Sequence, residues 1–327
     1  ITATNNATLT ITGVGVTQPI QNNKKSSSFI FNLPVVFDSE GGTETLRFNN
    51  GTQDITFSSS LTLNDPLTVS GTNKNHDLNL NGSLLGSANL IFGAKTQANF
   101  GSAYDGSSYA GTLTTAGGAA STNNQVTIIS NVADDGTFLK SAGSLNVTKD
   151  GASITVNGAN TLKGNIAIGN FSPTLTIHKN QSAVETITMG SGTLNLSLNP
   201  AVTTLAFADN SSSDWGTGSL VITGAADNEV SFGTDASGIT SAQLAQITMS
   251  GSQAVISNTG KLSVKEVAVS TFNNAGGDNL WSNVANWSAG IPNVATAKVT
   301  VDADLIIDSI VTVGQIKTSG LTSAASV

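Results

Sequence analysis

Short stretches in which apolar and polar residues strictly alternate recur along almost the whole chain. Clear examples are "SITVNG", "PTLTIHK", "TLNLSLN" and "SLVITG". Alternation with a period of two produces a strand with one buried face and one exposed face. Glycine, asparagine, aspartate and serine separate the stretches, as tight turns require. Because helical periodicity is nearly absent, the pattern predicts an all-β fold.

Two interleaved sets of these stretches share one spacing. The first set begins near Ile154, Leu175, Leu194 and Leu220, and the second near Ile166, Ile187, Leu205 and Val230. Steps within either set are 18 to 26 residues long. A β-solenoid produces this pattern, because each coil supplies the same strands and each strand stacks on its equivalent one coil later. We therefore predict a parallel β-solenoid, with tandem β-sandwiches as the alternative.

One short helix is expected over residues 240–247, where Thr240 and Gln243 have the spacing of a capping box. Its apolar residues Leu244 and Ile247 would cover an open end of the solenoid, since exposed sheet edges need a cap. A hairpin through Asn258-Thr259-Gly260 follows. The pattern predicts three parts: a solenoid body over residues 1–233, a terminal cap over 234–271, and a tryptophan-containing opening of a following β segment or unit over 272–327.

Composition excludes several classes of partner. Only 10% of the residues are charged, the net charge is −8, and the 13 basic residues are scattered. Nucleic acid and anionic lipid both need a basic surface, which this chain lacks. The absence of cysteine excludes disulfides and thiolate metal sites. We also expect no membrane insertion, because no apolar run approaches the length of a spanning helix.

Four aromatic residues are candidates for ligand contact. Trp281 and Trp287 lie in "DNLWSNVANWSAGIP", and Tyr104 and Tyr109 lie in "GSAYDGSSYAG". Aromatic rings can stack on sugars, but two large rings can equally plug the open end of a solenoid by burying apolar area. We favour the plug for the tryptophans. The composition around the tyrosines predicts an exposed insertion, which makes them the alternative ligand contacts.

Three aspartates, Asp302, Asp304 and Asp308, offer oxygen ligands of the kind that Ca²⁺ prefers. Residues 302 and 304 of one strand would share an exposed face, and no calcium loop is specified, so a solvated face is the favoured interpretation. Asp134 and Asp135 precede a glycine and fit a turn better than a catalytic pair. We therefore predict no catalytic residues, no enzyme activity, and no cofactor other than this weakly specified calcium.

Three longer stretches carry a resemblance. "SSSDWGTGSLVITG" through "GSQAVISNTGKLSV" is similar to a terminal coil and cap, and "NLWSNVANWSAGIPNVATAKVTV" to the opening of a solenoid. "NATLTITGVGVTQPIQNN" with "FNLPVVFDSEGGTETLRFNNG" is similar to the coils that follow such an opening. The chain in this way resembles the passenger regions of exported bacterial surface proteins, autotransporter-like adhesins and surface-filament repeat proteins. The resemblance implies a right-handed parallel β-helix without catalytic residues.

The opening-like stretch lies late in the chain, and its natural continuation lies early. We therefore expect one unit of a tandem or head-to-tail array, in which residues 273–327 start a solenoid that the next unit continues. The expected function is a structural building block of an extracellular cell-surface filament, adhesin stalk or layer. Its partners would be copies of itself or adjacent repeats of the same polypeptide. The alternative is a carbohydrate-binding or carbohydrate-active β-helix module whose partners are glycans.

Overall fold

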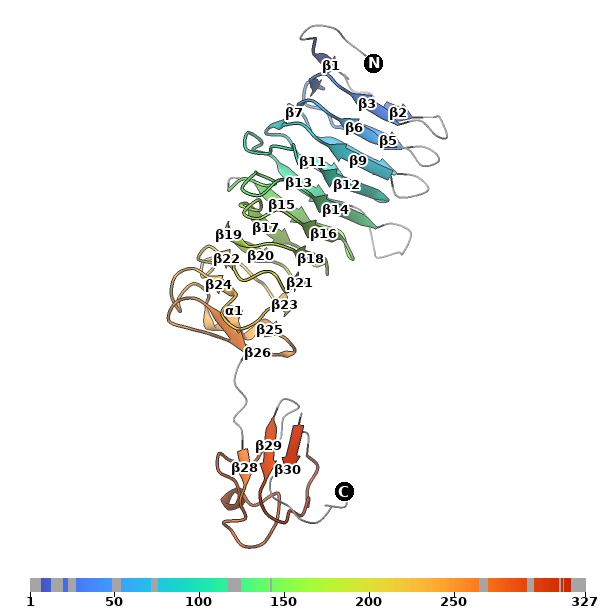
Figure 1. The fold of residues 1–327 in the computed structure, drawn as a ribbon. Coiled ribbons are helices and arrows are strands. Elements are labelled where there is room, and N and C mark those ends of the chain that lie inside the picture. The colour runs from blue at the N-terminus through green and yellow to red at the C-terminus, as the bar shows by residue number, and fades with distance from the viewer. Residues whose placement is uncertain are drawn as a thin grey trace. The chain divides into compact units, whose positions relative to one another are not determined.

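The computed structural model describes residues 7–12, 20–22, 28–48, 54–71, 76–116, 125–141, 143–264, 270–292, 297–311, 313 and 315–318. The chain forms two compact units, Ile1–Val264 and Lys265–Val327. The first unit is a parallel β-solenoid of about nine turns, which confirms the predicted fold class (Figure 1). The finer division into three parts stays a prediction.

The longest sheet of the solenoid has twelve strands. From the first coil to the last they are β3 (Phe29–Phe31), β6 (Ile55–Phe57), β9 (His76–Leu80), β12 (Thr96–Phe100), β14 (Val126–Ser130), β16 (Ser153–Val156), β18 (Thr174–Ile177), β21 (Thr193–Leu198), β23 (Ser219–Thr223), β25 (Ile247–Met249), β26 (Ser252–Ile256) and β27 (Leu262–Val264). Neighbouring strands are parallel as far as β25, and β26 and β27 then turn back antiparallel.

Three further sheets complete the coils. The eight-stranded sheet contains β2 (Ile20–Asn22), β5 (Glu44–Phe48), β8 (Leu67–Gly71), β11 (Leu90–Phe92), β13 (Thr112–Thr115), β15 (Ser144–Val147), β17 (Asn165–Ile168) and β20 (Ile187–Met189). The four-stranded sheet contains β1 (Leu9–Ile11), β4 (Val35–Phe37), β7 (Leu61–Leu63) and β10 (Leu84–Gly86). The three-stranded sheet contains β19 (Gln181–Val184), β22 (Leu205–Phe207) and β24 (Val230–Phe232).

The first set of stretches stacks in one sheet as predicted, with one step displaced by two residues, and the second set does so only in part. Ile154 pairs with Leu175 and Leu194 pairs with Leu220 in the longest sheet, whereas Leu175 pairs with Leu196. Ile166 pairs with Ile187 in the eight-stranded sheet. The remaining pair, Leu205 with Val230, belongs instead to the three-stranded sheet, so the second set changes sheet after β20.

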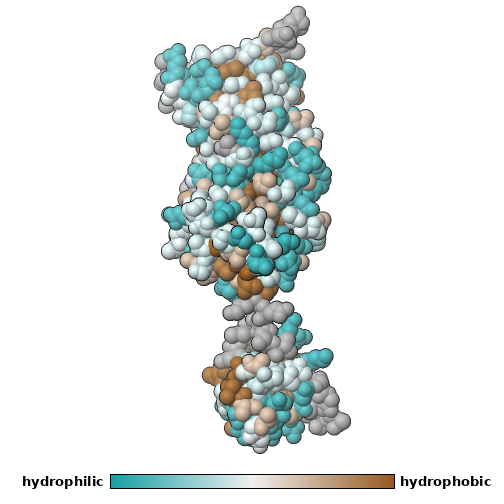
Figure 2. Space-filling model, turned by 90° about the vertical axis from the view of Figure 1, so that its left-hand side faces the viewer, coloured by the Kyte–Doolittle hydropathy of each residue, from teal (hydrophilic) through white to brown (hydrophobic). Residues whose placement is uncertain are grey.

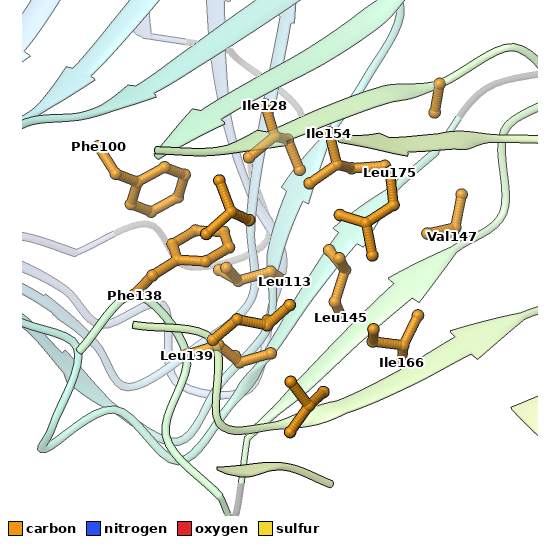
Figure 3. Close-up of a cluster of buried hydrophobic side chains, with 14 of the residues drawn as sticks. Phe100, Leu113, Ile128, Phe138, Leu139, Leu145, Val147, Ile154, Ile166 and Leu175 are labelled. Atoms are coloured by element: carbon orange, nitrogen blue, oxygen red, sulfur yellow. The ribbon is translucent and has the colours of Figure 1, made fainter. Parts of the chain in front are cut away.

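The core is a stack of inward-facing aliphatic and aromatic side chains, part of which Figure 3 shows. Ile154 and Leu175 are 1% and 2% exposed, and each is the strand partner of the other. Burying one such side chain contributes roughly 1.5–3 kcal/mol. Aromatic rings pack together in one part of this core: the ring of Phe100 meets those of Tyr104 and Phe138 edge-on at centroid distances of 4.7 and 4.9 Å.

The single helix among the described residues of the solenoid is α1 (Ser241–Ala245), with Thr240 as N-cap. The predicted capping box is confirmed, because the Thr240 and Gln243 side chains each bond the other's backbone. The helix is shorter than expected, since Ile247 instead begins β25 and pairs with Leu220. Gln243 is buried, and its Nε2 donates to the carbonyls of Asn210 and Ser213 at 2.8 Å each. The helix is thereby fastened to the last coils.

The second unit contains the parallel strands β28 (Ser270–Phe272), β29 (Lys298–Val301) and β30 (Gln315–Thr318), with a 3₁₀ turn η1 (Val284–Asn286). Its core is formed by Phe272, Trp281, Trp287, Val299 and Val301. Over the described part of both units, the helices are too short and too polar to cross a membrane.

Candidate functional site

The two tryptophans of the second unit lie inside its core. Trp281 is 0% exposed and Trp287 is 6% exposed. Their rings meet edge-on with centroids 4.6 Å apart, and Phe272 meets Trp287 in the same way at 5.1 Å. Trp287 Nε1 also donates to the carbonyl oxygen of Trp281 at 2.8 Å. These contacts favour a packing role over the ligand contact that the sequence offered as an option.

The tryptophan segment also covers one edge of the sheet. Trp287 forms an antiparallel bridge with Phe272 of β28. The N–H of Asn273 donates to the carbonyl of Asn286 at 2.9 Å, and the N–H of Ser288 donates to that of Thr271 at 3.0 Å. Because β28 is the first strand of this sheet, the segment closes its leading edge. That these tryptophans plug the open end of a solenoid stays a prediction.

Asp278 organises the turn before the tryptophans. Its two carboxylate oxygens accept from Asn286 Nδ2 and Asn283 Nδ2, each at 2.7 Å, and one also accepts from the N–H of Leu280 at 3.1 Å. Hydrogen bonds to the charged form stabilise it, so these donors, with Asn286 first, lower the pKa of Asp278. Asn286 is fully buried, and its Oδ1 accepts from the N–H of Gly276 at 2.7 Å.

The three aspartates proposed as calcium ligands do not gather into a site. Asp302, Asp304 and Asp308 are all exposed. Asp308 accepts hydrogen bonds from the hydroxyl and from the N–H of Ser282, the latter at 2.9 Å, and these bonds lower its pKa. Across the described residues, no group of three acidic, histidine or cysteine side chains is placed to hold a metal ion. The structure therefore gives the calcium prediction no support, and Asp308 instead fastens the tryptophan segment.

The two tyrosines lie in the solenoid core, so the expected exposed insertion is wrong for their rings. Tyr104 is 3% and Tyr109 is 2% exposed. The Tyr109 hydroxyl donates to the carbonyl of Ala88 at 2.7 Å and accepts from the N–H of Leu90 at 3.1 Å. Burial raises the pKa of Tyr104 well above its ordinary range, and burial also raises the pKa of Tyr109. Neither ring offers a face to a ligand.

Sequence reasoning missed the residues that end the eight-stranded sheet. Beyond β20, Asn210 Oδ1 accepts from the N–H of Ile187 at 2.6 Å, and Trp215 Nε1 donates to the carbonyl of Ile187 at 3.0 Å. We call these two side chains the end bracket. Together with the carbonyl of Asp214, which accepts from the N–H of Met189 at 2.9 Å, they take the place of a next strand. Asn210 is 0% and Trp215 2% exposed. The sequence does contain one indication of this end: the loop "ADNSSSDW" interrupts the alternation of apolar and polar residues at the coil where the sheet ends.

A second buried amide stabilises the coil before the end bracket. Gln181 Oε1 accepts from the N–H groups of Thr161 and Leu162 at 3.0 Å each, and its Nε2 donates to the carbonyls of Gly158 and Lys179 at 2.7 and 3.0 Å. Burying an amide is tolerated only when its donors and acceptors are paired, as they are here. The buried amide of Gln181 therefore serves the fold, as that of Asn210 does.

Comparisons of the chain with protein family models, with curated proteins and with solved structures found no match. Conclusions about its function therefore depend on the geometry of the chain itself.

Proposed function

We propose that this chain is a structural building block of an extracellular cell-surface filament, adhesin stalk or layer. The observation that carries the proposal is the unbroken register of the longest sheet. Its strands from β3 to β25 pair in parallel from coil to coil, and their inward residues form one continuous apolar core. Every interior strand is hydrogen-bonded on both sides, so the stack resists bending and local opening.

The outward face of the solenoid also supports a structural role. Asparagines of successive coils bond one another: Asn99 Nδ2 donates to Asn79 Oδ1 at 3.0 Å, and Asn157 Nδ2 donates to Asn131 Oδ1 at 2.7 Å. Figure 2 shows that hydrophilic and neutral residues cover most of the solenoid face in view. A surface of hydroxyl and amide groups is solvated by water but carries little charge. Neighbouring solenoids can therefore pack side by side without strong electrostatic repulsion.

The alternative, a carbohydrate-binding or carbohydrate-active module, finds less support. Sugar recognition by stacking needs an accessible ring face. All four aromatic candidates are at most 6% exposed. Glycoside hydrolysis needs two carboxyl groups flanking one bond. The adjacent acids Asp134 and Asp135 are instead turn residues, and Asp134 forms an ion pair with Lys179 at 2.9 Å.

Two measurements test the proposed function. Electron microscopy of the purified chain should show a rod-shaped solenoid, and digestion with a broad-specificity protease should leave the described coils of residues 143–264 uncut. Protease added to intact producing cells should release fragments of the protein, as a surface location requires. Rapid digestion of the solenoid, or protection of the protein inside intact cells, would overturn the proposal. Specific binding on a glycan array would favour the alternative.

A further inference from the structure

The last strands of the solenoid sheets are closed by the chain itself. Beyond β10, the N–H of Leu84 donates to the carbonyl of Asp105 at 3.0 Å. Beyond β24, the N–H of Phe232 donates to the carbonyl of Gly260 at 2.9 Å, in the loop before β27. The end bracket closes β20, and the antiparallel hairpin of β26 and β27 closes the longest sheet. In the second unit, the tryptophan segment closes β28.

The start of the solenoid and the last strand of the second unit remain open within the described residues. At the start of the solenoid, β1, β2 and β3 pair only with β4, β5 and β6, respectively (Figure 1). In the second unit, β30 pairs only with β29. Unpaired strand edges present backbone donors and acceptors to any strand that approaches, and soluble proteins normally block them. In this chain, the edges that precede β3 and follow β30 lack such a block in the described part of the structure.

The apolar rows that run inside each sheet are unfinished at the same two edges. Phe29 of β3 pairs with the buried Ile55, yet it is 40% exposed. Ile316 of β30 pairs with Val299, which is 2% exposed, yet Ile316 itself is 48% exposed. Both side chains therefore lie on the core face of their strand without a neighbour on the far side. One further parallel strand at either edge would remove this apolar area from water.

The two open edges are complementary. The free side of β30 follows the last strand of its sheet, and the free side of β3 precedes the first strand of its own. A parallel sheet continues when such sides meet, whereas β30 meeting a second β30 about a twofold axis would place the strands antiparallel.

We infer that β30 of one copy of this chain pairs in parallel with β3 of a second copy, so that Ile316 stacks on Phe29. The inference rests on the proposed function and names the contact through which the building blocks join. In such a pair, β3 of the first copy and β30 of the second copy are still free to bind further copies. Such a heterologous contact adds copies in one direction and produces a linear chain rather than a closed dimer.

Disulfide trapping tests this contact directly, because the chain has no cysteine of its own. Inward side chains on paired strands lie within the Cα separation that a disulfide spans. We would mix the single variants Ile316→Cys and Phe29→Cys under mild oxidation. The expected product is a dimer with one chain of each kind, because the contact raises the effective thiol concentration. In the matched control mixture, Thr176→Cys replaces Phe29→Cys, and the dimer should form about tenfold more slowly. Thr176 faces outward from β18 in the middle of the longest sheet.

A chain that carries both Ile316→Cys and Phe29→Cys should form a ladder of linear multimers. Substituting Ile316→Lys in the otherwise native chain should lower its self-association at high concentration while leaving its circular dichroism spectrum unchanged. Dimers that join two Ile316→Cys chains, or cross-linking no faster than the control, would overturn the contact. A monomeric chain that still forms protease-resistant rods would overturn the contact alone, whereas loss of rods and resistance would overturn the proposed function.

Discussion

Asn210 Oδ1 accepts the N–H of Ile187 at 2.6 Å, and so a side chain stands where a strand carbonyl would be. The same Ile187 gives its carbonyl to the Trp215 indole at 3.0 Å. The eight-stranded sheet thus ends on these two side chains and on the carbonyl of Asp214, which accepts from the N–H of Met189 at 2.9 Å. These contacts let the sheet end without leaving the backbone groups of Ile187 unpaired.

Replacing Asn210→Ala should destabilise the solenoid by about 1–3 kcal/mol, because the buried N–H of Ile187 loses its acceptor. Urea unfolding followed by circular dichroism measures the change. Asn157→Ala is the matched control, since its amide bonds Asn131 at the exposed surface, and its cost should stay below about 0.5 kcal/mol. Equal costs for the two variants would contradict the bracket role.

The two tryptophans of the second unit should differ in their response to phenylalanine. Trp287→Phe removes the bond to the Trp281 carbonyl, whereas the buried Trp281 Nε1 has no hydrogen-bond partner among the described residues. Trp287→Phe should therefore cost about 1 kcal/mol more than Trp281→Phe, although both shrink the core similarly. Hydrogen exchange of β29 amides, read by mass spectrometry, reports the difference. A larger loss of protection in Trp281→Phe would refute the assignment.

Acid should loosen the second unit. The pKa values of Asp278 and Asp308 are lowered by hydrogen bonds that exist only in the folded chain, with Asn286 and Ser282 the leading donors. Their contribution is therefore present above the unfolded value of about 3.9 and is lost as pH falls through the lower folded values. Near-ultraviolet circular dichroism should follow this loss below about pH 4.

The variant Asp308→Asn provides the check on that pH dependence. It should weaken the acid response of the second unit, because the titrating group at Ser282 is gone. Asp304→Asn, at a neighbouring exposed position, is the matched control and should leave the response unchanged. An acid response that is the same in all three chains would mean that other groups cause it.

Alkali should act on the solenoid through its tyrosines. Burial raises the pKa of both Tyr104 and Tyr109, and the chain has no other tyrosine. The folded chain should therefore show no phenolate absorbance near pH 10, where an unfolded tyrosine is half ionised. The associated stability is intact below about pH 10 and is lost as pH rises through the higher folded values. Ordinary titration of either ring in the native chain would contradict its burial.

Calcium should leave the chain unchanged. Asp308 is engaged by Ser282, and the described residues bring no three acidic groups together. The melting temperature should be the same with excess Ca²⁺ and with a chelator. A rise on adding Ca²⁺ that Asp302→Asn abolishes would show a site that forms only when the ion binds.

Alternation and spacing predicted the solenoid because both follow from coil geometry. Ile154 and Leu175 occupy equivalent inward positions, and the sequence shows that equivalence as a shared step. The strand pairing after β20 was predicted wrongly. The strands at Leu205 and Val230 keep the same alternation of apolar and polar residues, so the sequence pattern does not show that the eight-stranded sheet has ended at Asn210 and Trp215. Polar side chains that replace a strand look like loop residues until their partners are known.

The tyrosines illustrate a different limit of sequence reasoning. Glycine, serine and aspartate around Tyr104 and Tyr109 are typical of exposed loops. In the structure, the glycines bring backbone close to the rings: a Cβ on Gly106 would lie 2.9 Å from the Tyr104 hydroxyl, and one on Gly111 would lie 2.5 Å from the Tyr109 hydroxyl. Small residues here permit burial of a large neighbour. Composition alone does not distinguish these two uses of glycine.

The helix α1 bonds the loop of Asn210 and Ser213, and the hairpin of β26 and β27 pairs with β25, the last parallel strand of the longest sheet. In the earlier coils, the described strands pair with those of the neighbouring coils. A gene duplication or deletion of one whole coil in the middle of the stack would leave every cap contact in place. Evolution can therefore change the reach of such a rod in steps of one coil while the terminating sequence stays constant. Related chains should differ in length by multiples of a coil and agree at the cap.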